Sequence, residues 1–222
     1  MITDMTTGMT GEMRQLLLLL NWMSPAFPTG AFAYSHGLEW AIDTGEVRSA
    51  GDLRGWISDL VTRGSGWNDA VLFGRCWMDD TDDLNALALA LCASRERHLE
   101  TAQLGRAFRI AAQVFAPAAP HDGDIAYPVA AGMASAAMGI GRAEALVAFL
   151  QGFCAAQVSV AVRLVPLGQT AGLEVLRDLM PVIASTALRA ARATCDDLGG
   201  ITIGADIAAM RHETQYSRVF RT

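Results

Sequence analysis

The chain has 222 residues, of which 52% are hydrophobic and 18% are charged. A chain this rich in apolar residues can bury a substantial core, which excludes disorder for most of its length. The 17 basic and 23 acidic residues give a formal net charge of −6. That balance does not favour nucleic acid, because affinity for nucleic acid depends on cationic contacts with phosphate.

All 17 basic residues are arginines, so the chain contains no lysine. A P-loop needs a lysine on the β- and γ-phosphates of its nucleotide, and Schiff-base chemistry needs a lysine amine. Lysine-dependent catalysis and P-loop GTP hydrolysis by this chain alone are therefore excluded. The four cysteines are widely spaced and form no C-x-x-C pair, which is typical of a reducing compartment.

The first quarter of the chain is expected to hold a leader, two short helices and a loop between them. Residues 1–11 show no periodicity and predict a flexible leader. A leucine-rich helix follows and ends near Pro25, because the residue before a proline avoids the helical region. Residues 24–33 contain two prolines, a glycine and several apolar residues, which predicts a shaped loop. A second helix is expected from Ser35 to Thr44, and Gly45 can end it in the left-handed conformation.

Helices are predicted along the rest of the chain as well. Apolar residues recur at helical spacing after Ser49, a further helix is expected from Asn68 to Met78, and a longer one ends before Pro117. The most apolar stretch, 145–162, is interrupted by polar residues and predicts a buried helix rather than a membrane span. The next helix, from about residue 170 to 195, is expected to kink or break at Pro181.

No strand pattern, repeat or interdomain linker is found in the sequence. The predicted fold class is therefore all-α, a single-domain helical bundle of about eight to ten helices with flexible N- and C-terminal segments. Its parts are the leader at residues 1–11, the helical domain at residues 12–204, and a short helix with a tail at residues 205–222.

Histidine and carboxylate residues form weak candidates for a metal site. One pair stands three residues apart on a predicted helix, and a loop triplet suits borderline metals such as nickel. Neither has the ligand number or spacing of a dedicated site, so we favour hydrogen bonding for His36 and Glu39 and a solvated loop for His121. We therefore predict no catalytic residue, no metal site and no tightly bound cofactor, and keep a small metal-dependent enzyme as the alternative function. The candidate ligands are His36 and Glu39 on the helix, His121, Asp122 and Asp124 in the loop, and His212 near the C-terminus.

Two segments that carry aromatic residues, the tail and the loop at 24–33, can pack either on the core or on a partner. Residues 210–222 carry a net charge of +2 against −8 for the rest of the chain, and Tyr216 and Phe220 add aromatic groups. Arginine together with aromatic residues is typical of a binding hot spot, although the tail can also pack on the chain's own core. In the loop, Phe27 and Phe32 are either core anchors, which we favour, or part of a partner surface. The core interpretation predicts that Phe32→Ala costs roughly 3–5 kcal/mol of stability.

Three segments resemble motifs of the UreF family of urease accessory proteins, and together they span most of the chain. SPAFPTGAFAYSHGLE at 24–39 is similar to the family's S-P-x-x-P-x-G-x-F-x-Y-S-x-G-L-E, and RLVPLGQ at 163–169 resembles R-L-x-P-L-G-Q. MRHETQYSRVFR at 210–221 is similar to M-R-H-E-x-Q-Y-S-R-L-F-R. The chain departs from the pattern at Ala31, Val219 and Thr222, where the family commonly has glycine, leucine and serine.

The matching residues carry the expected site. In the first motif they are Ser24, Pro25, Pro28, Gly30, Phe32, Tyr34, Ser35, Gly37, Leu38 and Glu39. In the second they are Arg163, Pro166, Leu167, Gly168 and Gln169. In the tail, which the resemblance assigns to partner binding, they are Met210, Arg211, His212, Glu213, Gln215, Tyr216, Ser217, Arg218, Phe220 and Arg221.

The resemblance implies an all-α, cytoplasmic chaperone without catalytic activity of its own. It implies binding to UreD (UreH in some species), recruitment of the GTPase UreG, and action on the urease apoprotein to assemble its nickel centre. Nickel would be handled by the complex and GTP bound by UreG, whose hydrolysis of GTP the chain would regulate. A homodimer within the complex is also implied, and no nucleic-acid or membrane partner is expected.

Overall fold

The computed structural model describes residues 10–115 and 123–221, and the fold of these residues is all-α, as predicted. They contain no strand, and their helices α1 to α10 fall within the predicted eight to ten. Two single 3₁₀ turns, at Ala31–Ala33 and Cys195–Asp197, complete the secondary structure. The helices are α1 Gly11–Trp22, α2 Leu38–Asp43, α3 Ala50–Arg63, α4 Ser65–Arg75, α5 Thr81–Ala90, α6 Arg95–Ala112, α7 Tyr127–Ala137, α8 Arg142–Leu164, α9 Gly168–Ala190 and α10 Ile203–His212.

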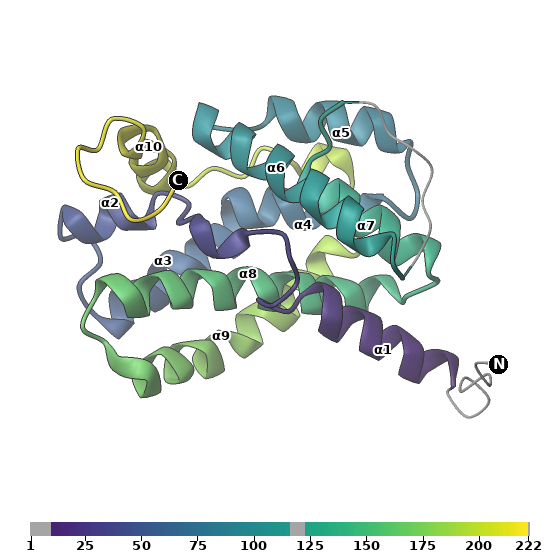
Figure 1. Ribbon diagram of the computed structural model, residues 1–222, viewed down its shortest axis with the longest axis horizontal. Coiled ribbons are helices and arrows are strands. Elements are labelled where there is room, and N and C mark those ends of the chain that lie inside the picture. The colour runs from purple at the N-terminus through teal and green to yellow at the C-terminus, as the bar shows by residue number, and fades with distance from the viewer. Residues whose placement is uncertain (1–9, 116–122, 222) are drawn as a thin grey trace.

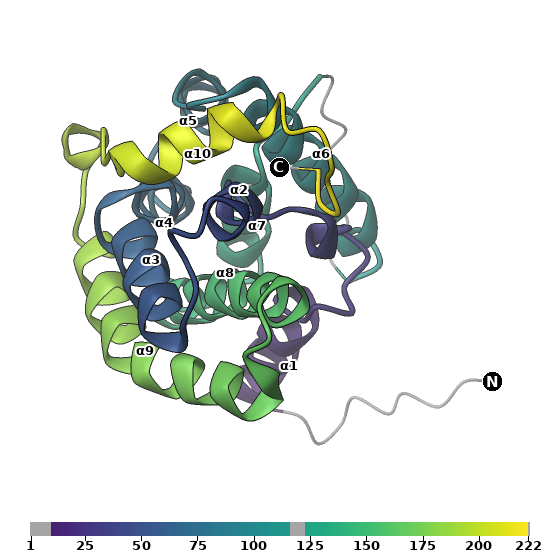
Figure 2. The ribbon, with the colours of Figure 1, turned by 90° about the vertical axis from the view of Figure 1, so that its left-hand side faces the viewer.

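The helices form one bundle in which α8 packs against α9 and contacts α2, α4 and α7 (Figure 1). Helix α10 and the end of the chain lie beside α2 at one end of the bundle, although α2 and α10 are far apart in the sequence (Figure 2). The N-terminal part of the chain and its C-terminal part therefore meet on one surface of the protein.

Aromatic side chains form much of the core between α1, α4, α6 and α8. The rings of Phe73 and Phe149 stack with their centroids 4.6 Å apart, and Trp22 meets Phe108 edge to face at 5.9 Å. Both arrangements are favoured by the ring quadrupole. Phe27, from the loop after α1, packs on Phe108 at 5.4 Å and anchors that loop to the core.

Two predictions of helix boundaries were wrong, because the local sequence did not decide where these helices begin or end. A kink or a break was expected at Pro181, and the break is absent: α9 continues from Gly168 to Ala190, with the proline inside it. The carbonyl four residues earlier belongs to Arg177, and both residues are exposed, so water can replace the lost hydrogen bond. Helix α4 begins at Ser65 rather than at Asn68, separated from α3 only by the extended residue Gly64.

Helix α8 is long and apolar enough to cross a membrane by length and composition alone. Half of the most apolar stretch of α8 is buried inside the protein. Leu146 and Leu150 of this helix are inaccessible to solvent. The predicted buried helix is thus found in the core, with part of one face open to a cavity described below.

Candidate interaction site

The three motif segments meet at one place in the structure. The guanidinium of Arg163, near the end of α8, donates a hydrogen bond of 3.3 Å to the carbonyl of Phe32 in the first motif. The same guanidinium lies 5.9 Å from the ring centroid of Phe220 in the tail. The backbone N–H of Arg221 donates to the carbonyl of Ala33 at 2.7 Å. Residues separated by more than a hundred positions in sequence therefore form one connected surface.

The tail packs on the chain's own core at two points and projects between them. His212 is fully buried and Phe220 is 5% exposed, whereas Tyr216 is fully exposed and Val219 is 73% exposed. Packing on the chain's own core therefore holds for His212 and Phe220, whereas Tyr216 and Val219 are open to solvent. Hydrogen bonds hold the C-terminal segment against α2 and α6.

Two carboxylates hold the tail, and together with His212 and Arg218 we call them the tail clamp. Glu39 on α2 lies 3.1 Å from His212 Nε2 and accepts hydrogen bonds from the backbone N–H groups of Val219 and Phe220 at 2.6 and 2.8 Å. Glu96 on α6 lies 2.8 Å from His212 Nδ1 and accepts a hydrogen bond from Arg218 at 2.6 Å. Both ring nitrogens of His212 thus face carboxylate oxygens, one from α2 and one from α6.

A glycine contact brings the first motif and α10 together at backbone distance. Gly37 precedes α2 with φ +77°, and a Cβ at this position would lie 2.6 Å from the backbone nitrogen of Ala209 on α10. Neither the left-handed conformation nor the close approach is readily available to other residues. Gly37 therefore allows α2 to approach α10 closely enough for Glu39 to reach the tail.

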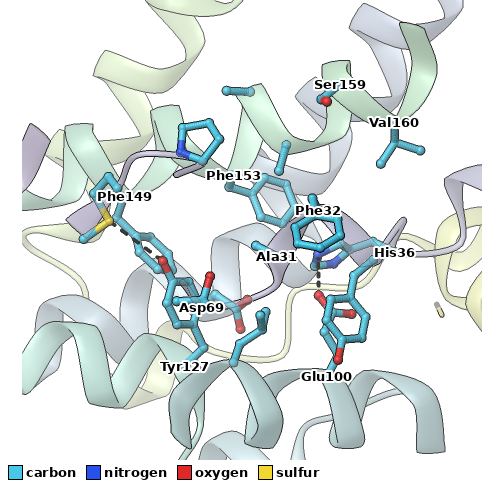
Figure 3. Close-up of a pocket in the computed structure, with 18 of the residues that line it drawn as sticks. Ala31, Phe32, His36, Asp69, Glu100, Tyr127, Phe149, Phe153, Ser159 and Val160 are labelled. Carbon is cyan, nitrogen blue, oxygen red and sulfur yellow. Dashed lines mark hydrogen bonds and ion pairs between the residues drawn. The ribbon is translucent and has the colours of Figure 1, made fainter. Parts of the chain in front are cut away.

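A cavity of about 370 Å³ lies under the first motif, between its loop and helices α4, α6 and α8. Phe149 and Phe153 form apolar walls, and Phe32 covers part of the cavity (Figure 3). Asp69 and Glu100 point into it, as Figure 3 shows. The cavity is thus lined by aromatic groups on one side and by charged groups on the other.

The charged side of the cavity is a buried network centred on Arg97. Its guanidinium contacts Glu100 at 2.8 Å and Asp69 at 3.4 Å, and His36 Nε2 lies 2.8 Å from the other oxygen of Glu100. Burial alone raises the pKa of Glu100, but the charges of Arg97 and His36 outweigh it and lower the pKa to about 2. Burial raises the pKa of Asp69, and the charge of Arg97 offsets this rise only in part. The network therefore holds Glu100 firmly ionised.

The weak metal candidates are not brought together. His36 contacts Glu100, whereas Glu39 belongs to the tail clamp with His212, so the expected pairing of His36 with Glu39 is absent. In residues 10–115 and 123–221, no group of three or more His, Cys, Asp or Glu side chains is arranged to hold a metal ion. His121 and Asp122 of the loop triplet lie outside the described residues.

The prediction that Phe32 anchors the core was wrong. Its side chain is 65% exposed, and Phe27 has the core position instead. The second motif forms the turn between α8 and α9, in which Gly168 adopts φ +74° and Gln169 is exposed at the start of α9. Glu96, Arg97 and Glu100 were not singled out from the sequence. Their spacing of i, i+1 and i+4 on a predicted helix was the only sequence feature that could have indicated them.

Comparison with known proteins decides the family. A sequence model of the UreF family matches residues 47–180. The chain belongs to the UreF family of urease accessory proteins. It is 48% identical over 214 residues to the urease accessory protein UreF of Mesorhizobium japonicum, covering 93% of this chain and 96% of that one. It is 46% identical over 217 residues to the corresponding protein of Brucella ovis, with 93% and 94% covered. For that of Methylobacterium sp. (strain 4-46) the identity is 45% over 220 residues, with 93% and 88% covered.

Membership of this family makes the chain an accessory protein of urease maturation and not itself an enzyme. The alternative function, a small metal-dependent enzyme, finds no support among these relatives. The described surface includes a tail that is held on the core at Phe220 and faces outward at Tyr216.

Proposed function

We propose that this protein is a cytoplasmic chaperone that binds UreD (UreH in some species) through its tail and, with UreD, recruits the GTPase UreG to the urease apoprotein. The complex then assembles the nickel centre of urease, with nickel handled by the complex and GTP bound by UreG. In this proposal the chain regulates GTP hydrolysis by UreG and is present as a homodimer within the complex. Family membership supports the accessory role, and the tail supports the choice of contact surface.

The observation that supports this contact surface is that Tyr216 is exposed on an ordered tail. A tyrosine that is fully exposed while its neighbours are fixed by buried hydrogen bonds is available for a partner at little entropic cost. Arg211 is exposed nearby, and its guanidinium can pair with carboxylates of a partner. The positive tail on an otherwise acidic chain favours an acidic patch on UreD.

The experiment is a binding measurement between this protein and UreD with single-site variants. Tyr216→Ala should weaken binding by more than about 1 kcal/mol, which is more than about fivefold in Kd. Leu188→Ala, at an exposed apolar position on α9, is the matched control and should leave binding unchanged. Deletion of residues 215–222 should abolish binding and stop urease activation in cells. Unchanged affinity of the truncated chain for UreD would refute the proposed contact.

A further inference from the structure

We propose that Glu39 is a positioning residue that holds both ends of the tail loop, residues 213–218, and so presents Tyr216 to the partner. The inference rests on the proposed function and deepens it, because it assigns the shape of the contact surface to one carboxylate on α2. Glu39 itself is buried, with its side chain 6% exposed, and lies under the loop rather than in the surface that a partner touches.

The geometry that carries the inference is the attachment of both loop ends to one group. On the N-terminal side of the tail loop, His212 Nε2 lies 3.1 Å from Glu39. On the C-terminal side, the N–H groups of Val219 and Phe220 donate to the two oxygens of Glu39 at 2.6 and 2.8 Å. Glu39 thus bridges the two ends of the loop from α2, as Glu96 does from α6 through His212 and Arg218. The middle of the loop, including Tyr216, projects into solvent.

Neighbouring contacts fix the direction of the loop as well as its closure. Arg218 pairs with Glu96 at 2.6 Å, and the carboxylate of Glu213 accepts hydrogen bonds from the backbone N–H groups at the start of α6, 2.8 Å from that of Arg95. These contacts attach the loop to α6, whereas Glu39 attaches it to α2. Loss of Glu39 would therefore leave the backbone N–H groups of Val219 and Phe220 without their acceptor and loosen the loop's C-terminal end, while its connection to α6 remains.

The physical consequence concerns the cost of binding. A free tail must lose backbone and side-chain freedom when it binds, whereas a loop already closed by charge-assisted hydrogen bonds has lost that freedom during folding. Hydrogen bonds to a buried carboxylate are stronger than those between neutral groups, so Glu39 can hold the backbone N–H groups of Val219 and Phe220 in place. Tyr216 gains no packing within the chain from this order, so the benefit of its fixed position goes to the complex.

The test is a double-mutant cycle measured as affinity for UreD. Glu39→Gln keeps the shape of the side chain but leaves one accepting oxygen in place of two and removes the charge. It should weaken binding at least fivefold, and Tyr216→Ala should then add less than a further twofold in the Glu39→Gln background. Glu46→Gln, which removes an exposed charge just beyond the same helix, is the matched control and should leave affinity unchanged.

A second readout separates positioning from a general loss of stability. Trypsin should cleave after Arg218 faster in Glu39→Gln than in the wild type, while cleavage within the helical bundle stays slow. If Glu39→Gln does not fold, Glu96→Gln replaces it in the same double-mutant cycle, because it removes part of the tail clamp on the α6 side. Tyr216→Ala should again add less than a further twofold loss of affinity in that background.

The outcomes distinguish this inference from the function on which it rests. If Glu39→Gln and Tyr216→Ala weaken binding independently, so that their fold-changes multiply in the double variant, the inference is overturned. The tail contact itself would still stand. Wild-type affinity of Glu39→Gln for UreD would overturn it in the same way. No effect of Tyr216→Ala in the wild-type chain would instead remove the tail contact itself.

Discussion

Replacing Gly37 by alanine should separate α2 from α10 and so test whether this close contact supports the tail. Gly37 has φ +77°, and its added Cβ would lie 2.6 Å from the backbone nitrogen of Ala209 and 3.0 Å from its Cα. Both atoms belong to the backbone of α10, so no side-chain rotation can relieve the overlap. One of the two helices must move.

The expected cost has two parts that a second glycine allows us to separate. A left-handed conformation costs an alanine roughly 1–2 kcal/mol, and overpacking against rigid structure adds about 1–3 kcal/mol. Gly30 has a similar φ of +81°, but nothing lies within 4 Å of its added Cβ. Gly30→Ala should therefore lose only the first part, whereas Gly37→Ala should lose about 2–5 kcal/mol.

Thermal and urea unfolding of the two variants give the comparison. For a domain of this size each kcal/mol lowers Tm by roughly 2–4 °C, so Gly37→Ala should melt about 4–20 °C below the wild type. The displacement of α10 should also expose the tail to trypsin, which Gly30→Ala should not do. Equal losses of stability in the two variants would refute the steric argument, because only the left-handed conformation is common to both.

The helices themselves were predictable because their apolar residues recur at helical spacing. In α3 the apolar residues that recur after Ser49 include Leu53, Ile57 and Leu60, and all three are buried. Ser49 caps the same helix by accepting a hydrogen bond from the N–H of Asp52 at 3.1 Å, as its position before the apolar run indicated. Periodicity and capping are local properties, so a single sequence carries them.

The site was less predictable because its contacts are not local. Glu39 and His212 are 173 residues apart, and nothing in either neighbourhood indicates that they form an ion pair. The motif resemblance located both residues, yet the interpretation of Glu39 as a partner of His36 was wrong, because the left-handed His36 (φ +54°) lies before α2 and contacts α6 instead. Periodicity also gave no way to tell which loop phenylalanine faces inward, so both were assigned to the core, although only Phe27 packs there.

Three further predictions follow from burial and charge. Phe32→Ala should lower the unfolding free energy by less than about 1 kcal/mol in urea titrations, whereas Phe27→Ala should cost roughly 3–5 kcal/mol; a reversed order would contradict the packing. Deleting residues 215–222 should lower Tm, measured by circular dichroism, because it removes buried Phe220 and leaves Glu39 without two donors; an unchanged Tm would contradict the tail clamp. Glu100→Gln should destabilise the protein at pH 7 by roughly 3–5 kcal/mol, because Arg97 loses a buried partner. The pKa of Glu100 falls from 4.5 unfolded to about 2 folded, so its contribution is complete above pH 4.5 and is lost as pH falls toward 2. Unfolding free energies measured across that window should therefore decline less steeply in Glu100→Gln than in the wild type, and parallel curves would show that Glu100 is not held ionised by Arg97.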